Sequence, residues 1–159
     1  MIAPGMIASV ALVFALESAV AAPVEPPAPK PAAVPKAEIL GVWKGTSICV
    51  KTAGNESCRD ETVVYSVIDV PNQPATVTLK AARLANDMLR PMYELDFTYR
   101  HDTATWSCAF ERPTFSGVWA YAVHGDDMTG TATLVPSMTV VRNVSARRVP
   151  PEDVSKFLP

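Results

Sequence analysis

Hydrophobic and polar residues alternate along eight short segments between Leu40 and Val149, with a dominant period of two residues. Turn-forming residues separate the segments, as at Ala53-Gly54-Asn55 and His124-Gly125-Asp126-Asp127. The predicted strands span residues 41–50, 61–70, 75–85, 91–100, 104–112, 115–123, 128–135 and 139–148. A meander this long leaves two exposed edges unless its first and last strands pair. The pattern therefore predicts an all-β fold, an antiparallel up-and-down β-barrel of about eight strands, with a β-sandwich as the alternative.

The predicted strand at residues 91–100 alternates most clearly, with an aromatic or aliphatic residue at every second position from Tyr93 to Tyr99. Residues 75–88 have a partly helical alternative, because residues 79–85 also suit a helix. Five aromatic side chains are expected to point into the barrel and to line any ligand space there: Phe97, Trp106, Phe110, Trp119 and Tyr121. Whether the interior is hollow or filled depends on how closely these rings meet, because small barrels are often filled by their own side chains.

The N-terminal 21 residues have the features of a secretory signal peptide. Their apolar run from Met6 to Leu16 is too short to span a bilayer, and Ala19-Val20-Ala21 fits a cleavage site. An uncleaved anchor is the alternative, because no Lys or Arg precedes the run. Residues 22–38 are rich in Pro and Ala and predict a disordered linker, followed by a barrel domain at 39–149 and a tail at 150–159. We expect a secreted or periplasmic protein.

The chain has three cysteines, and an exported protein reaches an oxidising compartment. Cys49 ends the first predicted strand and Cys58 precedes the second, so we predict a disulfide between them across the intervening turn. Cys108 alternates with Trp106 and Phe110, which predicts an inward, protected and unreactive thiol.

The tripeptide Gly41-Val42-Trp43 begins the first strand of an eight-segment meander behind a signal peptide, and in this it resembles the lipocalins and the wider calycin superfamily. The resemblance implies a lipocalin-like barrel in which this Trp closes one end and an Arg late in the last strand packs across its ring. Arg142, Arg147 and Arg148 are the candidates, and Arg142 is the one assigned. The strands are shorter than is typical of lipocalins, and no amphipathic helix follows the last one. Ligand binding therefore does not follow from the fold alone.

The sequence shows no catalytic constellation, so we expect a non-enzymatic protein without a cofactor. Its two histidines, His101 and His124, fall in predicted turns, and neither has metal-ligating residues at the spacing a site requires. Asp60 and Glu61 form a tight acidic pair and are expected to be solvated at a loop edge. A formal net charge of -2, with no basic stripe, argues against nucleic-acid binding.

Three functions fit these observations. The first is a small exported barrel that binds a small apolar ligand. The second is a non-enzymatic envelope module for protein–protein interaction, whose outer apolar patch would contain Val64, Ile68, Val118 and Val141. The third is an eight-stranded outer-membrane barrel, with charged residues such as Lys80, Glu94 and Asp96 filling the lumen and apolar residues facing lipid.

Overall fold

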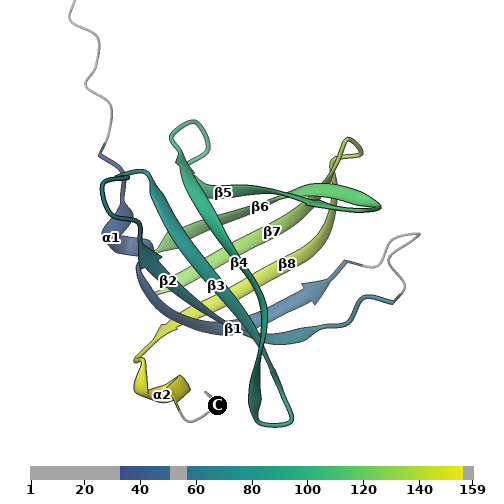
Figure 1. The fold of residues 1–159 in the computed structure, drawn as a ribbon, viewed down its shortest axis with the longest axis horizontal. Helices are drawn as coiled ribbons and strands as arrows, with labels where there is room; N and C mark the ends of the chain where they lie inside the picture. The colour runs from purple at the N-terminus through teal and green to yellow at the C-terminus, as the bar shows by residue number, and fades with distance from the viewer. Residues whose placement is uncertain (1–32, 51–56, 156–159) are drawn as a thin grey trace, which may run out of the picture. The chain divides into compact units, whose positions relative to one another are not determined.

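The computed structural model describes residues 33–50 and 57–155. Within them the chain forms a closed antiparallel barrel, in which each strand pairs with its neighbours in sequence and the last pairs with the first (Figure 1). The strands are β1 (Gly41–Cys49), β2 (Glu61–Asp69), β3 (Thr76–Ala85), β4 (Met88–Arg100), β5 (Thr105–Arg112), β6 (Phe115–His124), β7 (Asp127–Val135) and β8 (Thr139–Val149). Two short helices flank them, α1 (Lys36–Ile39) and α2 (Glu152–Ser155). The predicted eight-stranded up-and-down barrel is confirmed.

The strand bounds follow the predicted ones closely, except that β4 begins at Met88 instead of residue 91. Residues 76–85 form a strand, so the helical alternative for this stretch is wrong. The predicted signal peptide and the linker as far as residue 32 lie outside the described residues. Neither described helix is long and apolar enough to cross a membrane.

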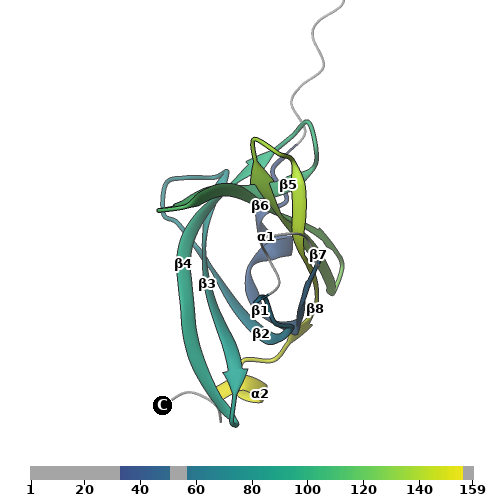
Figure 2. The ribbon, with the colours of Figure 1, turned by 90° about the vertical axis from the view of Figure 1, so that its right-hand side faces the viewer.

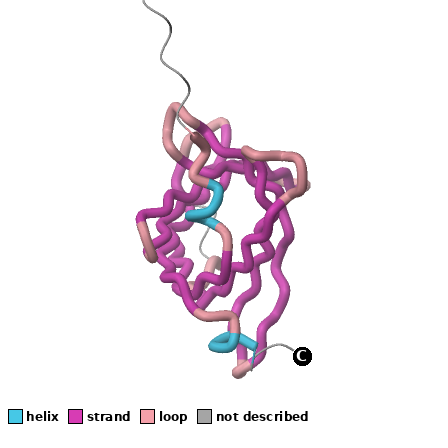
Figure 3. Tube along the Cα trace, turned by 90° about the vertical axis from the view of Figure 1, so that its left-hand side faces the viewer, coloured by secondary structure: helices cyan, strands magenta, loops and turns pink. Residues whose placement is uncertain are grey.

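Helix α1 lies across one end of the barrel, where Figure 3 shows it against the surrounding strands. Its last residue, Ile39, is fully buried in the main hydrophobic core, and the Trp43 indole Nε1 donates a 2.9 Å hydrogen bond to the Ile39 carbonyl. Phe97, Trp106 and Met128 are buried in the same core. This end of the barrel is therefore closed and packed.

Where β3 pairs with β4, the apolar residues face inward and charged residues such as Lys80 and Glu94 face outward. Leu79 and Leu95 pair across β3 and β4 on the inner face, whereas the next pair, Lys80 and Glu94, is about half exposed and forms an ion pair of 3.3 Å. The outer-membrane alternative required the opposite orientation, with these charges in the lumen, and the strand alternation contradicts it.

A second, smaller apolar cluster lies on the outside of the barrel. Val64 on the outer face of β2 is 5% exposed because it packs with Leu89, near the tip of the β3–β4 hairpin that extends beyond the barrel (Figure 1). Val141 packs against the main core instead of facing outward. Val64 and Val141 are therefore not available for the outer apolar patch expected of a protein-interaction module. Ile68, a third member of that patch, is exposed.

Candidate functional site

Strands β4 and β5 separate along most of their length, which opens the barrel on one side. Their pairing is limited to residues 98–100 of β4 and 105–107 of β5. Beyond this point the first part of β4 pairs with β3 and the last part of β5 pairs with β6. Figure 2 looks toward this region from the end opposite α1, with β4 and β5 on different sides of the view.

A cavity of about 980 Å³ occupies the opening. Pockets that hold small organic ligands are typically about 300–1,000 Å³, so this volume lies at the upper end of that range. Apolar and aromatic side chains contribute most of its inner wall: Met92, Tyr93, Leu95, Phe110, Phe115, Trp119, Ala132, Leu134 and Val141. Its polar lining residues are Ser57, Glu94, Glu111, Arg112, Thr114 and Arg142.

Trp119 on β6 is the centre of an aromatic wall in this cavity. Its ring stacks against Tyr93 and Tyr121, with centroid separations of 5.8 and 5.9 Å. Phe110 on β5 lies 6.2 Å away and tilted. Gly117 makes room for Phe110, because a Cβ there would lie 2.6 Å from the Phe110 Cζ atom. The wall offers a ligand stacking surface as well as apolar area.

Three tyrosine side chains meet at the inner side of this wall. The hydroxyls of Tyr93 and Tyr121 are 3.2 Å apart, and the rings of Tyr65 and Tyr121 meet edge to face at 5.6 Å. Burial raises the pKa of Tyr65 to about 12, and it also raises the pKa values of Tyr93 and Tyr121 well above their ordinary range. All three hydroxyls therefore stay protonated at neutral pH and can donate hydrogen bonds.

Arg142 on β8 brings a positive charge to the cavity wall. Its Nη1 donates to the Ser47 hydroxyl at 2.9 Å, and its Nη2 donates to the Arg59 carbonyl at 3.3 Å. Its side chain is 20% exposed, and its charge opposes the rise in the pKa of Tyr65 and Tyr93 that burial causes.

Glu61 on β2 is the counterion of Arg142, with 3.1 Å between Oε2 and Nη1. Its other oxygen lies 3.4 Å from Nη1 of Arg83. The side chain of Glu61 is only 14% exposed, which corrects the expectation of a solvated loop-edge carboxylate. The sequence spacing could have indicated this burial, because residues two and four positions apart on a strand face the same side. Glu61 therefore shares the inward face of β2 with Val63 and Tyr65, which are both buried.

The disulfide between Cys49 and Cys58 forms as predicted, with Cα atoms 6.0 Å apart. Cys58 lines the cavity, and the Cys49 amide donates a 2.8 Å hydrogen bond to the Asp60 carboxylate. The bridge joins the end of β1 to the segment that leads into β2. It therefore fixes the backbone around Arg59, whose carbonyl accepts from Arg142.

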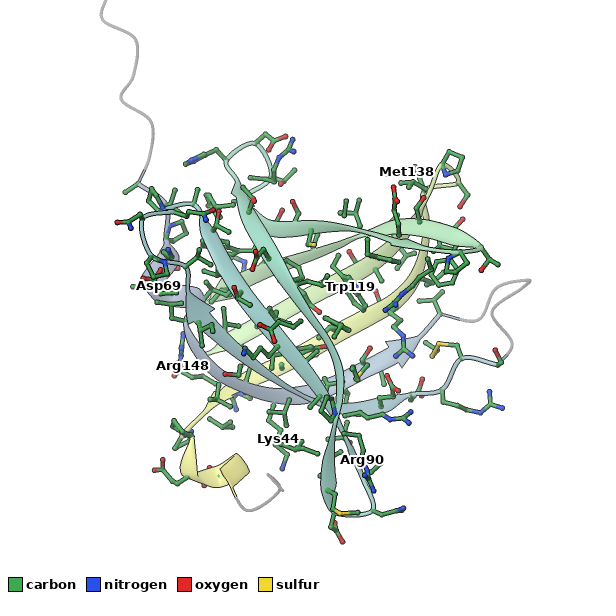
Figure 4. All side chains as sticks on the ribbon, viewed as in Figure 1. Lys44, Asp69, Arg90, Trp119, Met138 and Arg148 are labelled. Carbon is green, nitrogen blue, oxygen red and sulfur yellow. A yellow bond between two sulfur atoms is a disulfide. The ribbon has the colours of Figure 1, made fainter. Side chains whose placement is uncertain are left out.

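The closing arginine is Arg148, and the assignment of Arg142 to this role is wrong. The guanidinium carbon of Arg148 lies 4.2 Å from the centroid of the Trp43 ring, whereas Arg142 pairs with Cys49 at the far end of β1. Figure 4 shows Arg148 toward the α1 end of the barrel and Trp119 farther along the interior.

Only two of the five aromatic residues expected to line a ligand space do so. Phe110 and Trp119 line the cavity, whereas Phe97, Trp106 and Tyr121 are buried in the packed core, which corrects the expectation for these three. They were indistinguishable from the others in sequence because all five alternate inward.

Cys108 is an unpaired thiol that is half-buried, less enclosed than its inward alternation indicated. Burial, with a smaller contribution from Asp96, raises its pKa. Among residues 33–50 and 57–155, no group of three His, Cys, Asp or Glu side chains is arranged to hold a metal ion.

No family model matches the chain, and no curated protein matches it significantly. One of the solved structures similar to it is that of the siderocalin Ex-FABP, described as functioning through dual ligand specificities. The two chains are 14% identical, the match covers 76% of this chain and 82% of that one, and the TM-score is 0.46. The closed order of eight antiparallel strands is a lipocalin-like fold, as the resemblance implied.

Proposed function

We propose that this barrel is a non-enzymatic binding protein that holds a small, mainly apolar molecule in the cavity between β4 and β5. The observation that carries the proposal is a space of about 980 Å³ whose wall includes Trp119 and Phe110. Burial of a ligand's apolar surface there is favourable by roughly 25 cal/mol per Å². An aromatic ligand also gains stacking on Trp119.

A fluorescent apolar probe tests this directly. N-phenyl-1-naphthylamine is uncharged and brightens when it leaves water, so titration should show one saturable site. Leu134→Trp places a large ring in the cavity, because Leu134 lines it. We expect this substitution to weaken probe binding about tenfold, or by about 1.4 kcal/mol.

The matched control is Thr129→Trp, on the exposed outer face of the same strand, β7. It adds the same ring without entering the cavity and should leave the affinity for the probe unchanged. The proposal fails if the probe does not bind the native protein, or if both variants bind it equally well.

We also propose that the protein works outside the cytosol. The predicted signal peptide supports this, and so does the intramolecular disulfide, which persists in oxidising compartments. Cell fractionation followed by mass spectrometry should find the mature chain in the periplasm or medium, beginning at Ala22. Recovery of the full-length chain from the cytosol would refute export.

A further inference from the structure

We propose that the ligand carries an anionic group, a carboxylate, sulfonate or phosphate, which replaces the Glu61 carboxylate on the guanidinium of Arg142. The inference rests on the proposed function, since it assigns the charged end of a molecule held in the same cavity. It comes from a set of three charged residues, the largely buried Glu61 and Arg142 and the more exposed Arg83, which we call the interior charge cluster.

Arg142 is held in place without Glu61. The Ser47 hydroxyl and the Arg59 carbonyl accept hydrogen bonds from its two terminal nitrogens, and both acceptors are uncharged. These contacts fix the guanidinium at the cavity wall before any ligand arrives. A preorganised cation loses little conformational entropy on binding, so it suits recognition of an anion.

The contact between Arg142 and Glu61 is poorly made. Glu61 Oε2 is fully buried and accepts no hydrogen bond from any described residue, although Nη1 of Arg142 is only 3.1 Å away. A guanidinium and a carboxylate normally meet through aligned and often paired hydrogen bonds. The present pair therefore leaves part of its interaction energy unrealised, and a better aligned anion in the cavity can compete with it.

Glu61 has a second partner when it is displaced. Its Oε1 already lies 3.4 Å from Nη1 of Arg83, whose side chain is 53% exposed. The carboxylate can stay paired at that side while the ligand occupies Arg142. The interior charge cluster contains two guanidiniums and one carboxylate, so an added anion balances its charge.

The other carboxylates near the cavity do not supply this missing anion. Glu94 is paired with Lys80 on the outer face, and Asp60 accepts a hydrogen bond from the Cys49 amide. Glu111 lines the cavity but is exposed. Tyr93 also lines the cavity, and its hydroxyl is 3.2 Å from that of Tyr121.

Two probes with the same ring system distinguish the contribution of an anionic group to the affinity from that of apolar contact. They are N-phenyl-1-naphthylamine, which is neutral, and 8-anilinonaphthalene-1-sulfonate, which adds a sulfonate. Arg142→Gln should weaken binding of the sulfonate about tenfold or more, as expected for loss of a charge-assisted hydrogen bond. It should weaken binding of the neutral probe several times less than binding of the sulfonate, because only the sulfonate loses a charged partner.

Glu61→Gln gives the opposite result if the proposal is correct. It removes the competing charge and keeps the acceptors that position Arg142, so affinity for the sulfonate should rise severalfold. The control is Arg147→Gln, which removes the same charge from the outer face of β8, where Arg147 pairs with Asp127. This control should leave both affinities unchanged.

The two probes distinguish failure of the anion site from failure of the proposed apolar binding. If neither probe binds the native protein, both proposals fail. If the neutral probe binds but Arg142→Gln and Arg147→Gln weaken the sulfonate equally, only the anion site is refuted. If Arg142→Gln does not fold, Glu61→Gln decides alone, and unchanged or weaker binding of the sulfonate there overturns the proposal.

Discussion

The guanidinium of Arg148 lies over the ring of Trp43, and the two residues are directly opposite each other on β8 and β1. Arg148 also donates to the carbonyls of Glu38 and Leu40 and forms a 3.1 Å ion pair with Asp126. One side chain thereby joins the last strand, the first strand, the segment at α1 and the β6–β7 turn.

Arg148→Ala should lower the free energy of unfolding by about 2–3 kcal/mol, from the lost cation–π contact and the unpaired backbone carbonyls. Urea denaturation measures the loss. Arg147→Ala is the matched control, because the Arg147 side chain is exposed and its ion pair is with the exposed Asp127. It should change stability by less than about 0.5 kcal/mol. Equal effects of the two substitutions would contradict a closing role for Arg148.

The sequence could predict that an arginine of β8 packs on Trp43, but it could not decide between Arg142 and Arg148. Both arginines face inward, because they are separated by an even number of residues on one strand. Only the register between β1 and β8 distinguishes them, and it places Arg148 at Trp43 and Arg142 at Cys49. These strands are joined by no turn of their own, so no local signal sets their register.

The alternation predicted the strands, their inner faces and the closed barrel, but not the cavity. The cavity exists because β4 and β5 pair only near the turn that joins them, and a period of two does not reveal where a ladder stops. Glu61 was missed for a related reason. A carboxylate beside a loop is usually solvated, and its burial here depends on Arg142, which lies far away in sequence.

Peptide mapping without reduction should recover Cys49 linked to Cys58 and Cys108 as a thiol. Replacing both bridged cysteines with Ala should lower the free energy of unfolding by about 2–3 kcal/mol, because the lost ring is short. Native Cys108 should react with iodoacetamide more slowly than an exposed thiol, since its pKa is raised by burial. A bridge that includes Cys108 would contradict the fold of β5.

Because three tyrosines are buried, we expect the barrel to lose stability at alkaline pH. An unfolded tyrosine ionises near pH 10, whereas Tyr65 in the barrel has a pKa of about 12, so the unfolded state loses its proton first. The stabilisation is complete below pH 10 and is lost as the pH rises to 12, by about 3 kcal/mol for Tyr65.

Tyrosinate absorbance and circular dichroism measured together test this. Tyr65, Tyr93 and Tyr121 should ionise only as the barrel unfolds, because burial raises the pKa of each. Tyr65→Phe should make the decline in stability between pH 10 and 12 less steep. Ionisation of all three tyrosines near pH 10 with the barrel intact would disprove their burial.

Gly117 controls the position of Phe110 at the cavity wall. A Cβ at residue 117 would lie 2.6 Å from Phe110 Cζ and 2.6 Å from the carbonyl oxygen of Thr133, so both the ring and the backbone of β7 must move. Gly117→Ala should therefore destabilise the barrel by about 1–3 kcal/mol, the usual cost of overpacking. It should also weaken binding of N-phenyl-1-naphthylamine, because Phe110 is part of the cavity wall.

Ser116→Ala is the matched control for Gly117→Ala, because Ser116 is the preceding residue of β6 and lies on its opposite face. Thermal denaturation and probe titration of the two variants should separate them clearly, with Ser116→Ala close to the native protein in both. If Gly117→Ala keeps native stability and probe affinity, Phe110 does not pack across Gly117. That result would contradict the packing of Phe110 beside Trp119 in the cavity wall.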